Sequence, residues 1–175
     1  MDQDFLLIRE MKRGNEEAME VFVRKYYPQI LKYCNFHCAD RAQAEDLTQE
    51  TFLHFFRALA GYAYKEKTLN YLYSIARNLC TDQWRKSREI VMEDLPETGE
   101  ERMGKVEERL MMEEALWHLP EALREVLILR FFQELKIREI AKILDIGVPT
   151  VKYRLKKALA FMEQELGKEA ENGNG

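Results

Sequence analysis

The hydrophobic and polar positions between residues 44 and 59 follow the period of a helix with two unlike faces. One face is acidic and recurs at spacings of four, three and four, with a glutamine beside it: Asp46, Glu50, Leu53, Arg57 and Gln49. The opposite face is apolar: Leu47, Phe52, Phe55 and Leu59. The apolar face can be buried in a core, whereas the acidic face must meet water or a partner. It is therefore a candidate docking surface, although an ordinary solvated face has the same periodicity.

The same reasoning predicts three more helices in the first half of the chain. Gly14 would end the first helix, and Asn15, Asp40 and Thr68 would cap the next three. Pro28 lies inside the second helix and should kink or divide it. The predicted helices span about 5–13, 16–38, 41–59 and 69–88, with a loop at 61–67.

The composition changes between Glu89 and Glu108, where eight acidic residues and two basic ones accompany a proline and two glycines. This segment is typical of a flexible acidic linker. Beyond it the pattern predicts helices at about 106–118, 120–132, 136–144 and 149–166, followed by a frayed tail. The predicted fold is all-α, with two small helical domains. Their boundaries are a first domain at 1–88, the acidic linker at 89–108, a second domain at 109–167 and a flexible tail at 168–175.

The last two predicted helices have the spacing of a helix-turn-helix, and Gly147 would supply the backbone freedom of the turn. The final helix has an apolar stripe that should be buried: Val151, Leu155, Ala158, Leu159, Met162 and Leu166. Residues 136–162 contain seven basic and two acidic side chains, although the whole chain has a net charge of −4. Such a helix suits the major groove of DNA. A solvated, lysine-rich surface helix is the alternative.

Aromatic and cationic side chains alternate along the 69–88 helix and the loop before it. The loop contributes Tyr62, Tyr64, Lys65 and Lys67, and the helix contributes Tyr71, Tyr73, Arg77, Trp84, Arg85 and Arg88. Aromatic faces can stack on unpaired bases while cations contact phosphates, so the combination suits single-stranded nucleic acid. The alternative is that the aromatic rings belong to the core and keep only their polar tips in water.

Several classes of function find no support in the sequence. No window is long and apolar enough for a membrane span, and the acidic start is unlike a secretory signal, so we expect a cytoplasmic protein. Cys34, His37 and Cys38 share a helix face and could offer three zinc ligands, but a fourth is not evident and buried thiols are the favoured interpretation. No phosphate loop or nucleophile motif is present. We therefore expect no enzyme activity, cofactor, metal or small-molecule substrate.

Taken in order along the chain, four segments resemble the bacterial RNA polymerase sigma factors of the sigma-70 family, in the extracytoplasmic-function (ECF) subfamily. The segments are AEDLTQETFLHFFRAL at 44–59, LNYLYSIARNLCTDQWRKSR at 69–88, LPEALREVLILRFFQELKIREIAKILDI at 119–146 and TVKYRLKKAL at 150–159. The similarity covers nearly the whole chain. It implies a region 2-like first domain and a region 4-like second domain, without region 3.

The resemblance also implies partners and their binding residues. Core RNA polymerase would dock its β′ clamp helices on the acidic helix through Asp46, Gln49, Glu50 and Leu53, and would offer its β flap to the second domain. The minus-ten promoter element would be melted and held by Tyr62, Tyr64, Lys65, Lys67, Arg77, Asn78, Arg85 and Arg88. The minus-thirty-five element would be read by Thr150, Lys152, Tyr153, Arg154, Lys156 and Lys157. The linker would pass through the polymerase cleft, and an anti-sigma factor, often membrane-anchored in this family, would hold the protein inactive.

The sequence departs from the family pattern in the turn before the last helix. The usual turn reads Ile-Pro-x-Gly-Thr-Val, whereas residues 146–151 read IGVPTV, so proline and glycine have exchanged places. We expect the fold to survive, with Pro149 at the first helical position. Tyr153 stands where a small residue is common, which leaves the promoter sequence open. A helix-turn-helix regulator that is not a sigma factor is the alternative function, but it would have no use for the acidic helix.

Overall fold

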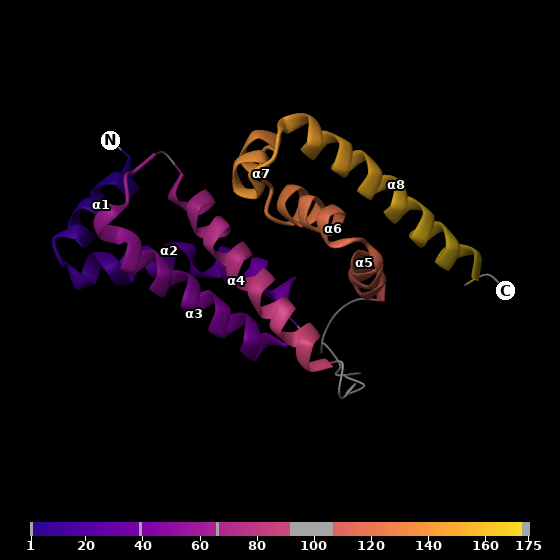
Figure 1. Cartoon of the computed structure of the whole chain (residues 1–175), viewed down its shortest axis with the longest axis horizontal. Coiled ribbons are helices and arrows are strands. Elements are labelled where there is room, and N and C mark those ends of the chain that lie inside the picture. The colour runs from indigo at the N-terminus through magenta and orange to yellow at the C-terminus, as the bar shows by residue number, and fades with distance from the viewer. Residues whose placement is uncertain (1, 39, 66, 92–106, 173–175) are drawn as a thin grey trace. The chain divides into compact units, whose positions relative to one another are not determined.

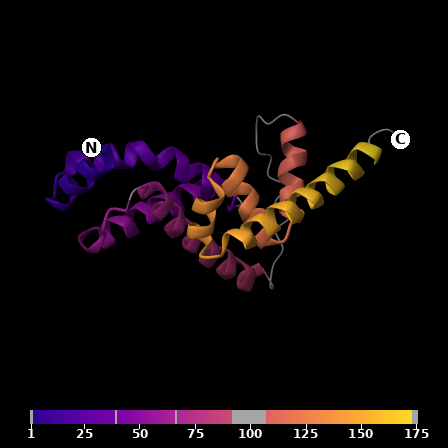
Figure 2. The same cartoon turned by 90° about the horizontal axis from the view of Figure 1, so that it is seen from above.

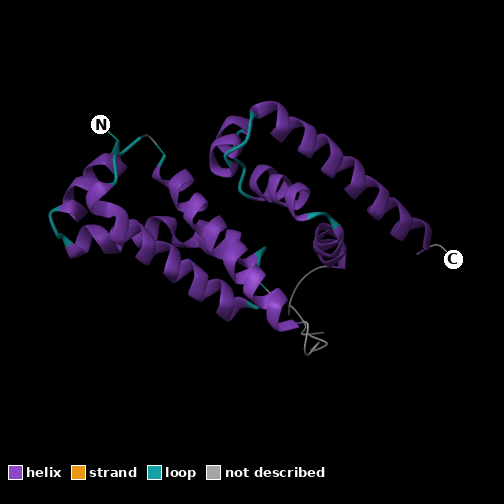
Figure 3. Ribbon diagram, in the orientation of Figure 1, coloured by secondary structure: helices purple, strands orange, loops and turns teal. Residues whose placement is uncertain are grey.

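The computed structural model describes residues 2–38, 40–65, 67–91 and 107–172. The chain divides into two compact units, Met1–Leu95 and Pro96–Gly175. Within the described residues every regular element is a helix, and short loops join them (Figures 1 and 3). The prediction of an all-α fold with two helical domains is confirmed. Most of the predicted acidic linker, residues 92–106, lies outside the described residues, while its ends at 89–91 and 107–108 are helical.

The described residues of the first unit form four α-helices and one 3₁₀ turn: α1 Gln3–Lys12, α2 Glu16–Asn35, α3 Arg41–Ala58, η1 Leu59–Gly61 and α4 Thr68–Val91. The predicted caps explain two of the helix starts. The Asn15 side chain accepts a hydrogen bond from the Ala18 amide at 3.2 Å, and the Asp40 side chain accepts one from the Gln43 amide at 2.8 Å. Gly14 follows α1 with a φ of 84°, which is the left-handed conformation that ends a helix.

Three predictions for the first unit need correction. α2 is a single helix through Pro28, so the division does not occur, while the kink, the other predicted outcome, stays a prediction. Pro28 itself is exposed. α2 also ends at Asn35, three residues before the predicted end. Thr68 is the first helical residue of α4, not a residue before it.

The core of the first unit is built from aromatic rings that α2 and α3 contribute. Phe22 and Phe55 have no exposed surface and stack with their ring centroids 4.8 Å apart. Tyr33 on α2 meets Tyr73 on α4 edge to face at 5.5 Å, which extends the same core to the third long helix. These contacts explain why α2, α3 and α4 pack together and why α3 must turn its acidic face outward.

The second unit contains α5 Glu107–His118, α6 Glu121–Leu127, the π-helical turn η2 Ile128–Phe132, α7 Ile137–Leu144 and α8 Val148–Asn172. Figures 1 and 2 show α8 as a long helix in both views. The core of the second unit is formed by side chains that are fully buried: Val126, Ile128, Leu129, Ile140 and Val151. Arg124 is also buried, and its guanidinium lies 4.7 Å from the centre of the Trp117 ring, a cation–π contact that compensates part of the lost hydration.

Two predictions about α8 are wrong. The segment after Gly167 was expected to fray, but the helix continues to Asn172. Leu159 was placed in the buried stripe, yet it is 48% exposed, whereas Val151, Leu155, Ala158 and Met162 are buried. Leu159 follows directly after the buried Ala158, and a step of one residue turns a helix by about 100°, which moves its side chain to the rim of the interface.

Candidate functional site

The acidic stripe of α3 faces solvent. Asp46 and Gln49 are exposed, Glu50 is half-buried, and Leu53 keeps 47% of its surface accessible. On the opposite side Phe52, Phe55 and Leu59 are buried, while Leu47 is half-buried. The helix therefore has the two faces that its periodicity predicts, and a large apolar side chain stands uncovered among the polar ones.

Within the acidic stripe, Glu50 has cationic or basic neighbours on the same helix, whereas Asp46 does not. The Glu50 carboxylate lies 3.3 Å from the His54 Nε2 and 3.8 Å from the Arg57 guanidinium. Each of the three side chains keeps at least 43% of its surface accessible, so water screens these pairs and they add little stability. Within the described residues, the Asp46 carboxylate lies at salt-bridge distance from no cationic side chain. The stripe thus presents carboxylates that a basic partner could pair with.

The loop before α4 holds its aromatic residues against the fold. The Tyr62 ring stacks on Tyr71 with centroids 5.0 Å apart, and it meets Phe55 edge to face at 5.3 Å. Its hydroxyl donates to the Thr68 hydroxyl at 3.5 Å. Tyr62 is consequently half-buried, and one of its faces is already occupied by another ring.

The second loop tyrosine is anchored to the N-terminal helix. The Tyr64 hydroxyl donates to the Asp2 carboxylate, and the Tyr64 ring meets Phe5 edge to face at 5.9 Å. This hydrogen bond is the main reason that the pKa of Asp2 lies below its usual value. Lys65 and Lys67 are both exposed, and Lys67 has a positive φ of 90°. The loop therefore exposes cations while its aromatic rings pack inward.

The polar face of α4 is exposed along much of its length. Arg77 is half-buried, Asn78 and Arg85 are exposed, and Trp84 is half-buried. Tyr71 keeps 37% of its surface accessible, whereas Tyr73 is fully buried in the core. Arg88 belongs to α4, but its side chain lies outside the described part of the structure. The structure thus assigns Tyr73 to the core and leaves Tyr71 as the more accessible aromatic residue of this helix.

The turn between α7 and α8 is made by a residue that sequence reasoning did not select. Asp145 adopts the left-handed conformation, with a φ of 53°. The Ile146 amide then donates to the Ala141 carbonyl at 3.0 Å, which closes the end of α7 as in a Schellman motif. Gly147, the predicted pivot, has no positive φ, and a side chain there would meet only the Pro149 ring at 3.5 Å, an ordinary contact. Moreover, α8 begins at Val148, so Pro149 is its second residue.

The outer face of α8 is basic and aromatic. Lys152, Lys156 and Lys157 are exposed, and Tyr153 has 62% of its surface accessible. Thr150 and Arg154 are half-buried at the edges of this face. The Lys157 ammonium lies 5.7 Å from the centre of the Tyr153 ring. A row of cations around one accessible ring can neutralise phosphates and contact base edges at the same time.

The cysteines lie together inside the first unit. Cys34, Cys38 and Cys80 are all free and buried, and the thiol of Cys80 lies 4.0 Å from that of Cys34. This contact, the one with Cys38 and burial all raise the pKa of the Cys80 thiol. His37 packs its ring 4.5 Å from Tyr33. Among the residues that the structure describes, no group of three His, Cys, Asp or Glu side chains is arranged to hold a metal ion.

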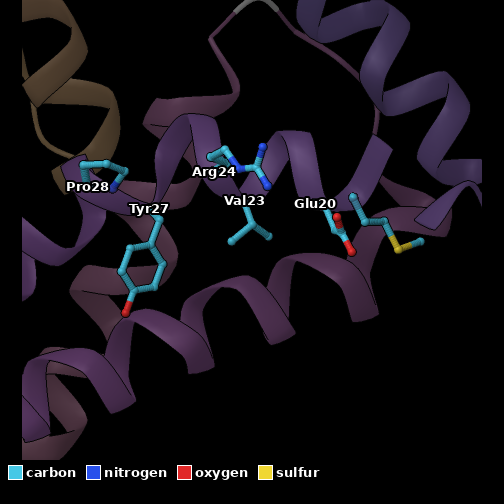
Figure 4. Close-up of a pocket in the computed structure, with 6 residues that line it drawn as sticks. Glu20, Val23, Arg24, Tyr27 and Pro28 are labelled. Carbon is cyan, nitrogen blue, oxygen red and sulfur yellow. The ribbon is translucent and has the colours of Figure 1, made fainter. Parts of the chain in front are cut away.

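A groove of about 600 Å³ runs along the exposed side of α2 (Figure 4). It is lined by Met19, Glu20, Val23, Arg24, Tyr27 and Pro28. The Tyr27 ring lies stacked 6.3 Å from Phe52 of α3, so one end of the groove reaches toward the core contact between the two helices. The groove lies on α2 and shares no lining residue with the acidic stripe of α3.

Sequence reasoning missed the contacts that α1 makes. Asp4 is buried and accepts hydrogen bonds from the Tyr26 hydroxyl and, at 2.6 Å, from the Lys25 ammonium. Burial, and then the bond to Asp4, raise the pKa of Tyr26. Lys12 donates to the Tyr62 carbonyl at 2.6 Å. A buried position for Asp4 could not be read from a four-residue acidic start, because nothing in the pattern distinguishes it from Asp2.

Comparison with protein families matches both units. The model of sigma-70 region 2 matches residues 22–90, and that of sigma-70 region 4 matches residues 109–162. The chain is 26% identical to the ECF RNA polymerase sigma factor SigW of Bacillus subtilis (strain 168), over 91% of this chain and 94% of that protein. It is 28% identical to the RNA polymerase sigma-H factor of Pseudomonas aeruginosa, over 94% of each.

Solved structures with the same fold include two proteins in complex with a partner. CnrH in complex with the cytosolic domain of CnrY aligns with a TM-score of 0.76 and 20% identity, over 95% of this chain and 99% of that one. The sigma factor RpoE of Bartonella quintana, in complex with the anti-sigma factor NepR, aligns with a TM-score of 0.71 and 20% identity, over 85% and 96%. In addition, no helix in the described part of the chain has the length and apolar character of a membrane span.

Proposed function

Because the chain belongs to the ECF subfamily of the sigma-70 factors and directs RNA polymerase to promoters, we propose that its three exposed surfaces divide that task between them. The stripe of α3 binds core polymerase, the loop and α4 open the minus-ten element, and α8 reads the minus-thirty-five element. Sigma factors are not themselves catalytic, so each surface acts by binding. The observation that carries the proposal is the uncovered apolar and acidic face of α3, which a DNA-binding regulator acting alone would not need.

The docking stripe comprises Asp46, Gln49, Glu50 and Leu53, and its proposed partner is the pair of β′ clamp helices of core polymerase. Two carboxylates attract a basic partner, and Leu53 offers apolar surface at the centre of the contact. Asp46→Lys and Glu50→Lys should each weaken core binding at least tenfold, because reversal puts like charges together.

Glu17→Lys on α2 is the matched control, since it makes the same charge change at an exposed position outside the stripe. Affinity for core polymerase is measured by fluorescence anisotropy of a labelled chain, and thermal unfolding checks the fold. Equal affinities for the stripe variants and the control would refute this docking assignment.

The minus-ten surface comprises the cations and aromatic side chains of the loop and α4: Tyr62, Tyr64, Lys65, Lys67, Arg77, Asn78, Arg85 and Arg88. Exposed cations beside half-buried rings are consistent with a site that holds unpaired bases. Lys65→Ala with Lys67→Ala should reduce promoter opening, measured by permanganate oxidation of unpaired thymines, while core affinity stays within twofold. Normal opening by this double variant would remove the loop from the proposal.

The minus-thirty-five surface comprises Thr150, Lys152, Tyr153, Arg154, Lys156 and Lys157 on α8. Lys156→Ala and Lys157→Ala each remove one cation from the exposed face, so each should lower promoter affinity and make its salt dependence shallower. Lys168→Ala on the same helix is the control, because Lys168 is 70% exposed and lies 3.7 Å from Glu165. A salt slope that changes equally in all three variants would contradict specific phosphate contact by this face.

Further partners follow from the family. We infer that the second unit meets the β flap and that an anti-sigma factor covers the same surfaces when the protein is inactive. In support, the aligned sigma factor RpoE is bound to an anti-sigma factor, NepR. A membrane anchor would belong to the anti-sigma factor of this chain. The chain would then act in the cytoplasm, where polymerase and promoter DNA are found. Co-purification of a regulator that competes with core polymerase would test this inference.

A further inference from the structure

The N-terminal helix α1 is fixed to the rest of the first unit by a buried carboxylate. Asp4 is 5% exposed and accepts hydrogen bonds from two neighbouring residues of α2, Lys25 at 2.6 Å and Tyr26. Burial of a carboxylate is tolerated only when it is paired and hydrogen-bonded, and both conditions are met here. Ile8 and Met11 are buried further along the same helix. α1 is therefore a rigid part of the unit.

From this fixed position α1 holds the loop before α4 at two points. Near the N-terminal end of the helix, Asp2 accepts the Tyr64 hydroxyl and Phe5 meets the Tyr64 ring at 5.9 Å. At the C-terminal end, the Lys12 ammonium donates to the Tyr62 carbonyl at 2.6 Å. The ten residues of α1 span about 15 Å, so the two attachments are well separated along it. Figure 1 shows the loop passing beside the N-terminal end of α1.

These contacts restrict the loop in a specific way. A single attachment would let the segment 62–65 pivot, whereas two attachments at opposite ends of a rigid helix fix both its position and its direction. The Tyr62 ring is held independently by Tyr71 and Phe55, but its backbone carbonyl depends on Lys12. Loops lose considerable conformational entropy when they are ordered, and an ordered loop binds its target without that cost at the moment of binding.

We propose that α1 is a positioning element for promoter opening: Lys12, Asp2 and Phe5 hold the 62–65 loop in the conformation that receives the unpaired minus-ten DNA. The inference rests on the proposed role of the loop. Lys12, Asp2 and Phe5 act through the loop and not by binding DNA or polymerase themselves. Loss of the Lys12 attachment loosens the loop, slows promoter opening and leaves the docking stripe unaffected.

The test compares Lys12→Met with Arg13→Met and Lys12→Arg in the full-length chain. Arg13 is the next residue along, and among the residues that the structure describes its guanidinium pairs with Glu10 alone, at 3.1 Å, so its substitution removes the same charge but no described loop contact. Lys12→Arg restores a donor and a charge. Loop order is measured on the free protein as the rate of trypsin cleavage after Lys65. Promoter opening is measured with core polymerase by permanganate oxidation, core affinity by anisotropy, and fold stability by thermal unfolding.

The expected result is at least threefold faster cleavage after Lys65 and at least threefold slower promoter opening in Lys12→Met alone. Core affinity should stay within twofold, and Lys12→Arg should restore both loop readouts. The salt slope of promoter binding should not change, whereas a direct phosphate contact by Lys12 would reduce it by about one.

Unchanged cleavage would show that Lys12 does not order the loop, and faster cleavage with normal opening would show that loop order is not needed; either result overturns the inference. A reduced salt slope or an equal effect of Arg13→Met would also overturn it, in favour of a charge contact with DNA. The role of the loop itself is judged separately, by the Lys65→Ala, Lys67→Ala variant, so the two failures remain distinguishable.

Discussion

Leu53→Ala isolates the apolar part of the docking stripe from its charges. Full burial of a leucine side chain is worth about 1.5–3 kcal/mol, and Leu53 keeps 47% of its surface accessible in the free protein. A partner that covered the rest would therefore gain about half of that value, roughly 1 kcal/mol after the methyl that alanine retains is allowed for. Because about 1.4 kcal/mol corresponds to a tenfold change in affinity, the dissociation constant for core polymerase should rise about fivefold.

Val21→Ala provides the control for this prediction. Val21 on α2 is 44% exposed, close to the value for Leu53, but it lines a groove with α1 residues such as Leu6 and Leu7 and lies outside α3. Both variants should lose a similar and small amount of folding stability, about 1 kcal/mol or less, because half-exposed side chains are truncated. Only Leu53→Ala should weaken the complex with core polymerase.

The assay is a titration of labelled chain with core polymerase at two salt concentrations. Since Leu53 contributes apolar burial, its effect on affinity should be the same at both, whereas the effect of Asp46→Lys should shrink at high salt. A change of less than twofold for Leu53→Ala, or an equal change for Val21→Ala, would refute the reasoning that the uncovered leucine marks the centre of the interface.

The remaining predictions concern stability and DNA binding. Phe55→Ala should lower the free energy of unfolding of the first unit by about 3–5 kcal/mol, because Phe55 has no exposed surface and stacks on Phe22. Urea denaturation measures this loss, and a loss below about 1 kcal/mol would contradict the described core. Asp145→Gly should raise the melting temperature of the second unit, since glycine adopts the left-handed conformation at about 1 kcal/mol less cost, and a fall would contradict the turn geometry. Lys156→Ala should lower the salt slope of promoter binding by about one unit, and an unchanged slope would argue against phosphate contact.

The periodicity of the sequence was sufficient for the helices and for the exposure of the acidic stripe. Helical spacing alone fixes which side chains share a face, so the separation of Asp46 and Glu50 from the buried Phe52 and Phe55 could be predicted without knowledge of tertiary contacts. The basic face of α8 was predictable for the same reason. Leu159 was not, because helical rotation places it only at the edge of the buried stripe, and the reach of the neighbouring helices decides whether a residue at that edge is covered.

Contacts between segments distant in the sequence could not be predicted in this way. The attachment of the loop by Lys12 joins residues 50 positions apart, and a lone lysine in a short helix gives no sign of a specific acceptor. The turn before α8 failed for a different reason. Glycine is the usual residue with positive φ, but an aspartate also tolerates that conformation, and here Asp145 adopts it while Gly147 does not. The predicted roles of the site residues stay predictions until binding is measured.

We propose that this chain brings core RNA polymerase to promoters through two DNA-reading surfaces. Run-off transcription with core polymerase on a library of duplex templates with randomised upstream sequence tests it most directly. Transcripts are expected only when the chain is added, from templates enriched in two short motifs at a fixed separation, and they should be lost with Glu50→Lys. Tight binding of the chain to duplex DNA without initiation by any core enzyme would contradict it.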